Sequence, residues 1–362
     1  MNNSSSFLAR FGRVSFHLIF SLFLVLSSLW FLLAIWIQKP FNSTFSIIIM
    51  LIWAIFAIGI LVTYFAKNKA QSRKISRPKL VLIYVLGFAA TLLWYFNIPA
   101  KQDRDWSPDV ARIFTYEKHG DLVTINDIRD FNWKTEDQYD VHWDRRTFNI
   151  QNITGVSIIT SYWMGPQIAH TLVSFSFSDQ KPLVFSIEIR KEKNESFSAI
   201  GGFFRQFELS LIAADEKDIV YTRSNARGEQ VYFFPVKMGK NEAQALFLEY
   251  LDKSDQLHQH PKWYNTLSSN CTTLVFDMVQ AVDPHHLPKD YRLLASGYLP
   301  NYLYDLGALD HKWDMKTWYE KAHINPRAHR FDHFKYQDSL NFSKVIRLGL
   351  PAPALPDVIT QK

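Results

Sequence analysis

Cysteine is nearly absent from this sequence, because its 362 residues contain only one, Cys271. A single cysteine excludes an internal disulfide, so the fold must be stabilised without one. Internal repeats and low-complexity stretches are also absent. The architecture therefore has to be inferred from individual segments rather than from a repeating unit.

Charged residues are missing from three long stretches near the N-terminus, at residues 15–37, 45–65 and 80–96. A helix needs about 20 apolar residues, within a range of roughly 17–25, to cross the hydrocarbon core of a bilayer. The three stretches therefore predict transmembrane helices and a membrane domain at residues 1–97. The first is no cleaved signal sequence, because its apolar core is too long and no small-residue cleavage site follows it. A buried helical hairpin of a soluble protein is the alternative.

Basic residues flank these stretches unevenly. The formal net charge is +6 and the pI is about 9.1. Six lysines and arginines lie at residues 67–79, and Arg10 and Arg13 precede the first stretch, whereas Lys39 alone lies between the first two. The positive-inside rule then places the N-terminus in the cytoplasm, the helices in a bacterial inner membrane, and residues 98–362 in the periplasm. Membrane topology thus explains the excess of basic over acidic residues. We therefore expect the lipid bilayer as a partner and no nucleic acid.

The periplasmic part, residues 98–362, predicts an α+β domain with a mostly antiparallel sheet. Alternating or continuous apolar patterns indicate strands, and the turn residues at 178–182 indicate a hairpin. Residues 208–219 mix apolar and charged residues and favour a helix or turn. The expected strands are at 122–125, within 158–177, at 183–190 and at 231–236, and the expected helices are at 242–253 and 271–282.

The lone thiol lies on a side of the membrane that is usually oxidising, so its presence needs a reason. Cys271, Leu274, Val275 and Met278 follow one face of a helix, and Asn270 before them is a favoured N-cap. A helix N-terminus lowers the pKa of a thiol, and its free N–H groups can bind an oxyanion. Cys271 is therefore a candidate nucleophile, and a small buried core residue is the alternative.

A thiolate of this kind needs a base, and His170 has the best setting among the 12 histidines. If Phe177 pairs with Leu183, His170 faces Arg190 and lies diagonal to Glu188 on the polar face of a hairpin. Glu188 would then orient the imidazole as the third catalytic member. A surface histidine on an amphipathic strand is the alternative.

Other polar residues near Cys271 could position a substrate. Tyr264, Asn265 and Asn270 could donate to an oxyanion, or they could order the loop that enters the helix. Arg190 could position the substrate from the hairpin.

Charged residues elsewhere predict less. Arg223 and Arg227 could hold an anion, but a solvated turn is the default for such a segment. The pairs His258/His260 and His285/His286 lack companions at a zinc-like spacing, so we expect no metal and no cofactor.

The order of these motifs resembles the Lnb N-terminal periplasmic domain family. The resemblance covers residues 115–300 and rests on WYNTLSSNCTT at 263–273, IRDFNW at 128–133, SYW at 161–163 and the aromatic cluster at 139–145. It implies a permuted papain-like (NlpC-like) fold with Cys271 as nucleophile and His170 as base. It also implies N-acylation of bacterial lipoproteins. Here the membrane helices precede the thiol domain rather than follow it, so the domain chemistry carries over more directly than the substrate.

We therefore expect a membrane-anchored thiol acyltransferase or hydrolase that acts through an acyl-enzyme at Cys271 on a lipid, phospholipid or lipoprotein. An NlpC-like cell-wall peptidase or amidase is the second possibility, and it would need an open, polar groove. A non-enzymatic scaffold or binding module is the third, and it would bury Cys271 out of reach of His170.

The charge asymmetry makes the topology testable. A reporter that works only outside the cytoplasm should be active when fused after Lys362 and inactive when inserted within residues 67–79. The reverse pattern would contradict the topology.

Overall fold

The computed structural model describes residues 3–65, 76–282, 287–333, 337–353 and 355, and only the backbone of residues 3–14. The chain divides into two compact units. One consists of Met1–Ala100 with Phe204–Gln206, and the other of Lys101–Phe203 with Phe207–Lys362. Each unit is described separately below.

The first unit contains three long helices, which confirms the helical prediction. They are α1 (Asn3–Gln38), α2 (Ser43–Phe65) and α3 (Arg77–Phe96), and all three are long and apolar enough to cross a membrane. Large apolar side chains point outward, among them Ile55 at 71% exposure and Leu93 at 67%. An apolar exterior of this kind suits hydrocarbon rather than water.

Polar groups lie inside this unit instead. Tyr84 is fully buried, and its hydroxyl donates to the Leu24 carbonyl at 3.0 Å. The same hydroxyl lies 2.8 Å from both Ser27 Oγ and Ser28 Oγ. Hydrogen bonds between helices are the usual way to satisfy polar side chains in a membrane.

The second unit is α+β, as predicted. Its strands are β1 (Thr115–His119), β2 (Leu122–Arg129), β3 (Asn132–Trp133), β4 (Tyr139–Asp140), β5 (Trp143–Asn149), β6 (Ile153–Tyr162), β7 (His170–Phe177), β8 (Leu183–Arg190), β9 (Glu208–Ala214) and β10 (Gln230–Val236). Its α-helices are α4 (Ala199–Phe203), α5 (Glu216–Tyr221), α6 (Lys240–Gln259), α7 (Cys271–Val282), α8 (Leu299–Asp305), α9 (Met315–Ala322), α10 (Asn325–Phe331) and α11 (Ser339–Ile346).

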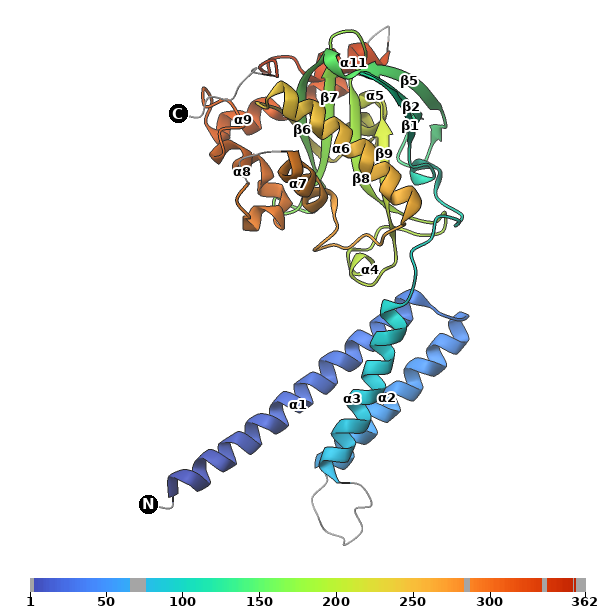
Figure 1. The fold of residues 1–362 in the computed structure, drawn as a ribbon, viewed down its shortest axis with the longest axis vertical. Helices are drawn as coiled ribbons and strands as arrows, with labels where there is room; N and C mark the ends of the chain where they lie inside the picture. Colours follow the sequence, from blue (N-terminus) through green and yellow to red (C-terminus); the bar gives the residue numbers. More distant parts are fainter. Residues whose placement is uncertain (1–2, 66–75, 283–286, 334–336, 354, 356–362) are drawn as a thin grey trace. The chain divides into compact units, whose positions relative to one another are not determined.

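The main sheet is mostly antiparallel and has the order β1-β2-β9-β8-β7-β6-β10, with β5 also paired to β2. One face packs against α6 and α7, and the other against α5, α10 and α11 (Figure 1). Strand β7 shows why both faces are covered. Val173 and Phe175 belong to the core under α6, while Leu172 belongs to the core on the opposite face. The sheet is thus the middle of three layers.

Strand β9 corrects the prediction of a helix or turn at residues 208–219. All its residues, Glu208–Ala214, are buried, and a helix follows only from Glu216. A strand covered on both faces loses the alternation of polar and apolar residues by which strands are recognised. The polar residues Glu208 and Ser210 are therefore buried rather than signs of a surface turn.

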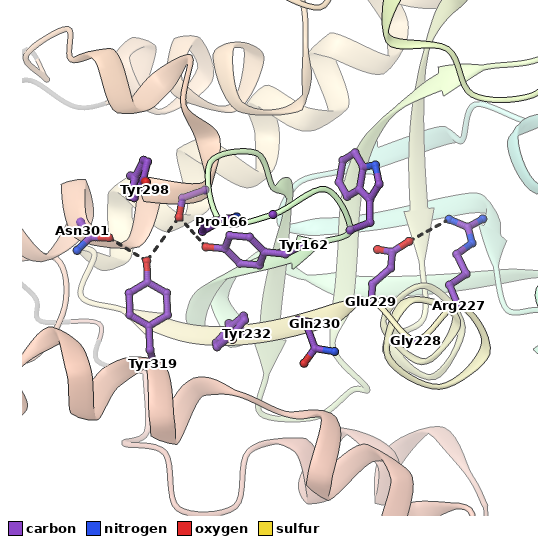
Figure 2. Close-up of a pocket in the computed structure, with 13 residues that line it drawn as sticks. Tyr162, Pro166, Arg227, Gly228, Glu229, Gln230, Tyr232, Tyr298, Asn301 and Tyr319 are labelled. Carbon is purple, nitrogen blue, oxygen red and sulfur yellow. Dashed lines mark hydrogen bonds and ion pairs between the residues drawn. The ribbon is translucent and has the colours of Figure 1, made fainter.

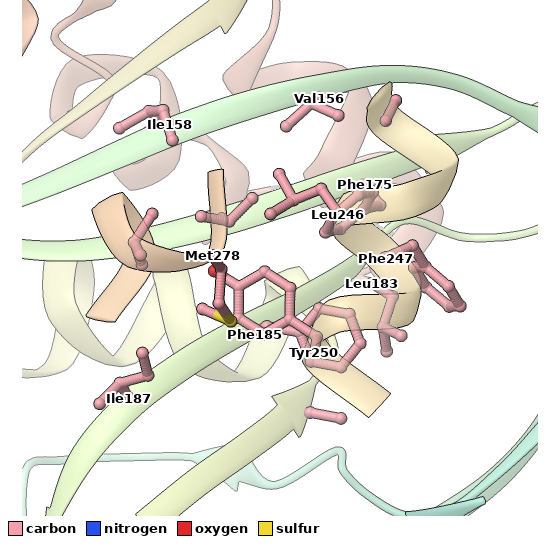
Figure 3. Close-up of a cluster of buried hydrophobic side chains, with 14 of the residues drawn as sticks. Val156, Ile158, Phe175, Leu183, Phe185, Ile187, Leu246, Phe247, Tyr250 and Met278 are labelled. Carbon is pink, nitrogen blue, oxygen red and sulfur yellow. The ribbon is translucent and has the colours of Figure 1, made fainter. Parts of the chain in front are cut away.

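Aromatic side chains fill the core between the sheet and α6 (Figure 3). Phe185 of β8 stacks on Tyr250 of α6, with ring centroids 4.5 Å apart and an interplanar angle of 8°. Phe175 and Phe247 meet Phe185 edge-on at 5.8 and 5.6 Å. Phe185 is therefore the centre of the cluster that fixes α6 to the sheet.

Replacement of Phe185 by alanine should lower the free energy of unfolding of this unit by about 3–5 kcal/mol, because it leaves a cavity in a close-packed core. The matched control is Leu122→Ala, which removes a side chain that is 49% exposed and should cost below about 1 kcal/mol. Denaturant titration measures both. Equal losses in the two variants would contradict the central place of Phe185.

Candidate active site

Cys271 is the first residue of α7 and is 6% exposed. Asn270 caps the helix, because its side-chain oxygen accepts the N–H groups of Thr272 and Thr273 at 2.9 Å each. In return, the Asn270 N–H donates to Thr273 Oγ at 3.0 Å. This reciprocal cap starts the helix at the cysteine and places the sulfur at the positive end of the helix dipole.

His170 is the first residue of β7 and is also buried. Its Nε2 lies 2.8 Å from Ser186 Oγ and 3.1 Å from Glu188 Oε1. Ser186 Oγ in turn donates to the same carboxylate oxygen at 2.7 Å. The carboxylate and the hydroxyl together fix the orientation of the imidazole ring.

The register of the hairpin differs from the one predicted. Leu172 pairs with Ser186 and Phe175 with Leu183, so the pairing of Phe177 with Leu183 was wrong by two residues. The pairing of β7 with β8 ends at Phe175 and Leu183. The connection between the two paired segments is therefore longer than the turn residues at 178–182 suggested. Because the displacement is even, the side chains keep their faces. Its effect is to place His170 opposite Glu188 rather than opposite Arg190.

Arg190 lies outside this group. Its guanidinium donates to the carbonyl oxygens of Val110 at 3.2 Å and Ala111 at 2.6 Å and to the Gln102 side chain. It also stacks over the ring of Trp106, 4.5 Å from the centroid. These contacts hold the segment that enters the domain, so we do not assign Arg190 to substrate positioning.

Arg223 joins the site although the sequence favoured a solvated turn for it. It lies in a turn of π-helix, Thr222–Ala226, and is buried. Its guanidinium contacts Glu188 Oε1 at 2.7 Å and Glu229 Oε2 at 3.3 Å. Insertions of π-helix often mark functional sites, and this one brings a buried cation to the carboxylate behind His170.

Charges therefore alternate along the series His170, Glu188, Arg223 and Glu229, in which the two cationic residues are buried and the two glutamates are partly buried. Burial opposes ionisation of Glu188, but the charges of His170 and Arg223 hold the pKa of this carboxylate well below its usual range. Burial and Arg223 lower the pKa of His170, yet Glu188 and Cys271 raise it to about 9. The imidazole is thus held in its protonated form at neutral pH.

The thiol responds to the same charges. Burial raises the pKa of Cys271, but the charge of His170, a hydrogen bond with it and a bond from the Thr171 N–H lower the pKa below its ordinary value. Since Nε2 faces Ser186 and Glu188, Nδ1 is the ring nitrogen left for the sulfur. A thiolate beside an imidazolium is the reactive form of a catalytic cysteine.

Cys271 and His170 reach each other from different layers. Thr171 Oγ lies 3.0 Å from Thr272 Oγ, so Thr171 faces α7. His170, one residue earlier, faces the opposite side with Ser186, as alternation along a strand requires. His170 is the first residue of β7, and its side chain is hydrogen-bonded to Cys271.

The three residues expected to bind an oxyanion differ in their contacts. Asn270 uses its side chain to cap Thr272 and Thr273. Asn265 Oδ1 accepts the N–H groups of residues 267 and 268 at 3.0 Å each, so it orders the loop before the helix. Burial raises the pKa of Tyr264, and so do the charges of Cys271 and Glu188. Tyr264 is therefore the side chain of the three that faces the thiolate.

One of the two histidine pairs considered for a metal, His258/His260, lies at the end of α6. His258 is close to the Phe114 carbonyl oxygen, at 3.2 Å, on α6. Within the described residues, no group of three or more histidines, cysteines or carboxylates could hold a metal ion. His285 and His286 lie outside the described residues.

Sequence reasoning gave Ser186 no role at the site, favoured a solvated turn for Arg223 and did not consider Glu229. The alternation in residues 183–190 placed Ser186 on the face of Glu188, so a hydroxyl between the two partners could have been proposed. Nothing in the sequence around Arg223 and Glu229 indicates burial, since the segment reads as a polar turn. Their positions depend on how α10 and α11 cover that face of the sheet.

The charge series predicts how the thiol reacts. Cys271 should alkylate with an apparent pKa below the value of about 8.5 for a free thiol. His170→Ala should raise that pKa and slow alkylation at pH 7 about tenfold or more, because the thiolate loses its cation but stays buried. Glu188→Gln should have a weaker effect, because the imidazole remains but is held less firmly in its charged form. Rates of iodoacetamide labelling between pH 5 and 10 measure this.

The control is Glu192→Gln, the same change at a carboxylate that pairs with Arg104 at 2.8 Å, and it should change nothing. If Cys271 reacts no faster than a free thiol and His170→Ala has no effect, the ion pair is refuted.

The chain was compared with known protein families, curated proteins and solved structures, and a match was found to one family. No curated protein and no solved structure matches the chain. The sequence model of the Lnb N-terminal periplasmic domain matches residues 139–297, a range that begins at β4 and includes His170, Glu188 and Cys271. The resemblance inferred from the sequence motifs is thereby confirmed over this range. Residues 139–297, which contain the candidate active site, are similar to the Lnb N-terminal periplasmic domain family.

Proposed function

We propose that this protein is a membrane-anchored thiol acyltransferase or hydrolase, with Cys271 as nucleophile and His170 as acid and base. The observation that carries the proposal is the arrangement of a thiol at a capped helix N-terminus with a buried imidazole that has its own carboxylate, and the charge of that imidazole lowers the pKa of the thiol. A purely structural cysteine needs none of these partners. A scaffold would also keep His170 away from the sulfur.

The chemistry runs in two halves. The Cys271 thiolate attacks the carbonyl carbon of an ester or amide, and a C–S bond forms. His170 gives its proton to the departing alcohol or amine, which leaves a thioester on Cys271. An acceptor amine or water then loses a proton to His170 and attacks the thioester. The C–S bond breaks and the thiolate is restored.

Two donors are available for the oxyanion of these steps. Asn270 occupies the N–H groups of Thr272 and Thr273, so the N–H of Cys271 itself is the first-turn donor that the cap leaves. The Tyr264 hydroxyl supplies the second, since its raised pKa keeps it protonated beside the thiolate. Preorganised donors of this kind are commonly worth about 3 kcal/mol or more in the transition state.

The substrate class follows from an exposed apolar rim next to the site. Its side chains are 41–59% exposed and come from three segments: Trp163, Met164 and Ile168; Phe197, Ile200 and Phe203; and Leu267. The first segment leads into His170 and the last into Cys271. The middle one joins the others, because Trp163 meets Phe197 at 6.0 Å and Gly202 lies against Thr266.

Exposed apolar clusters mark binding surfaces for apolar partners. The rim therefore favours a lipid-linked acyl group over the cell-wall peptides of an NlpC-like peptidase, which would call for a polar groove. The membrane anchor formed by the three N-terminal helices also fits a lipid-linked substrate. The second unit follows directly in sequence on three helices that are long and apolar enough to cross a membrane, so the protein would be attached to the membrane that contains a lipid substrate.

Two probes with the same chloromethyl ketone test the proposal, one carrying a 14-carbon acyl chain and the other a dipeptide. With full-length protein in nanodiscs, the acyl probe should label Cys271 about tenfold faster or more, because burial of its chain against the rim contributes binding free energy. Intact-mass spectrometry measures the rates, and Cys271→Ala should give no adduct.

A rim variant and a control locate the effect. Ile200→Ser should reduce the preference for the acyl probe, while Leu122→Ser, at an equally exposed residue of β2, should preserve it. Faster labelling by the dipeptide would favour the peptidase. Labelling of Cys271 no faster than that of a free thiol by either probe would refute the enzyme.

A further inference from the structure

A cavity lies beside the candidate active site and shares Glu229 with it, but it is lined by neither Cys271 nor His170. Its volume is about 730 Å³, which is within the usual range for small-molecule sites. The loop at residues 163–166 forms one wall before the chain continues to His170. Strand β10 and helices α8 and α9 contribute the other walls through Tyr232, Asn301 and Tyr319.

One end of the cavity carries hydroxyl and amide groups (Figure 2). Tyr162 Oη donates to the Gly297 carbonyl at 2.6 Å, and Tyr319 Oη donates to Asn301 Oδ1 at 2.8 Å. Gly297 is required there, because a Cβ would come within 2.0 Å of the Pro166 carbonyl oxygen. The close contact fixes the loop and sets the position of the tyrosine hydroxyls.

The other end carries a balanced pair of charges. Glu229 Oε1 lies 3.8 Å from the guanidinium of Arg227, and Oε2 accepts from Ser161 and Arg223. A free ammonium would have to compete with two arginines for this carboxylate. An anion that approached Arg227 would be repelled by the Glu229 carboxylate beside it. The pair therefore favours a ligand that carries no net charge but can accept and donate hydrogen bonds.

Aromatic rings occupy the middle. Tyr232 lies between the two polar ends in Figure 2, and its ring meets those of Tyr162 and Tyr319 edge-on at 5.3 and 5.5 Å. All three rings are only half-buried and line the cavity. An acyl chain would pack on the rings but would make no use of the hydrogen-bonding capacity that the hydroxyl, amide and carboxylate groups at both ends retain beyond their protein partners.

We propose that this cavity binds a neutral saccharide of one or two rings. A sugar has apolar C–H faces that pack on aromatic rings and hydroxyl groups around its edge that pair with hydroxyl, amide and carboxylate groups. The lining offers these features in the matching order, polar, aromatic and polar. The proposal goes beyond the acyl-transfer function and does not rest on it.

Calorimetry with Cys271→Ser protein tests binding in the absence of thiol chemistry. The full chain is held in a detergent without a sugar headgroup and titrated with diacetylchitobiose, cellobiose, octyl glucoside, choline and phosphoethanolamine. At least one saccharide should bind at millimolar concentration or below, and choline and phosphoethanolamine should not. Tighter binding of octyl glucoside than of both disaccharides would identify a glycolipid rather than a free glycan as the source.

Two variants assign the binding to this cavity. Tyr319→Phe should weaken the saccharide about fivefold to tenfold, because it removes one hydroxyl and changes little else. Tyr221→Phe is the matched control, since its hydroxyl pairs with Asp332 at 2.8 Å outside the cavity, and it should bind normally. Binding of choline or phosphoethanolamine in preference to the sugars, or no binding of any saccharide, would overturn the proposal whatever becomes of Cys271.

Discussion

The contact between Glu188 and two cations is the interaction on which the candidate site depends. Its Oε1 lies 3.1 Å from His170 Nε2 and 2.7 Å from Arg223. Without Arg223, the cationic group in direct contact with this partly buried carboxylate, among the described residues, would be an imidazole that can lose its proton. Removal of one member of such a buried ion pair generally costs about 3–5 kcal/mol. Arg223 thus lets the carboxylate stay ionised while it orients the imidazole.

The three-layer architecture makes this arrangement possible. If the face of the sheet on which Glu188 lies were exposed, Glu188 and Arg223 would lie in water. Solvent and salt would then screen their charges, and the charges would change the pKa of His170 little. Here α5, α10 and α11 cover that face, so the charges act on one another at low dielectric. The layer under α6 and α7 contains the aromatic core and presents Cys271. The sheet thus supplies His170 and the layer of α6 and α7 supplies Cys271 to the candidate site.

Much of this organisation could be predicted from the sequence. The three apolar stretches, the strand at residues 183–190 and the helix at 271–282 carry strong local signals, and the structure has all of them. The register of β7 on β8 was missed by two residues because the turn residues do not fix where the ladder ends. Strand β9 was missed because burial on both faces erased its alternation.

The residues of the candidate site also divide into those that the sequence could predict and those that it could not. Cys271 and His170 are recognisable because a helix cap and a strand start are local features of the chain. Arg223 and Glu229 are not recognisable, because their burial is produced by helices about a hundred residues further along the chain. Long-range packing of this kind leaves no local pattern, and a polar turn looks the same whether it is covered or not.

The burial of Cys271 has a consequence for turnover. Only 6% of the Cys271 surface is exposed, so under the proposed function the thiol would meet a substrate carbonyl only if the segments before His170 and before Cys271 moved apart. The same cover excludes oxidants from a thiolate that would otherwise be at risk outside the cytoplasm. The motion that would admit a substrate to the Cys271 thiol would therefore also admit oxidants. The maximum rate of the enzyme would then report that motion rather than bond formation, as happens in many enzymes with closing loops.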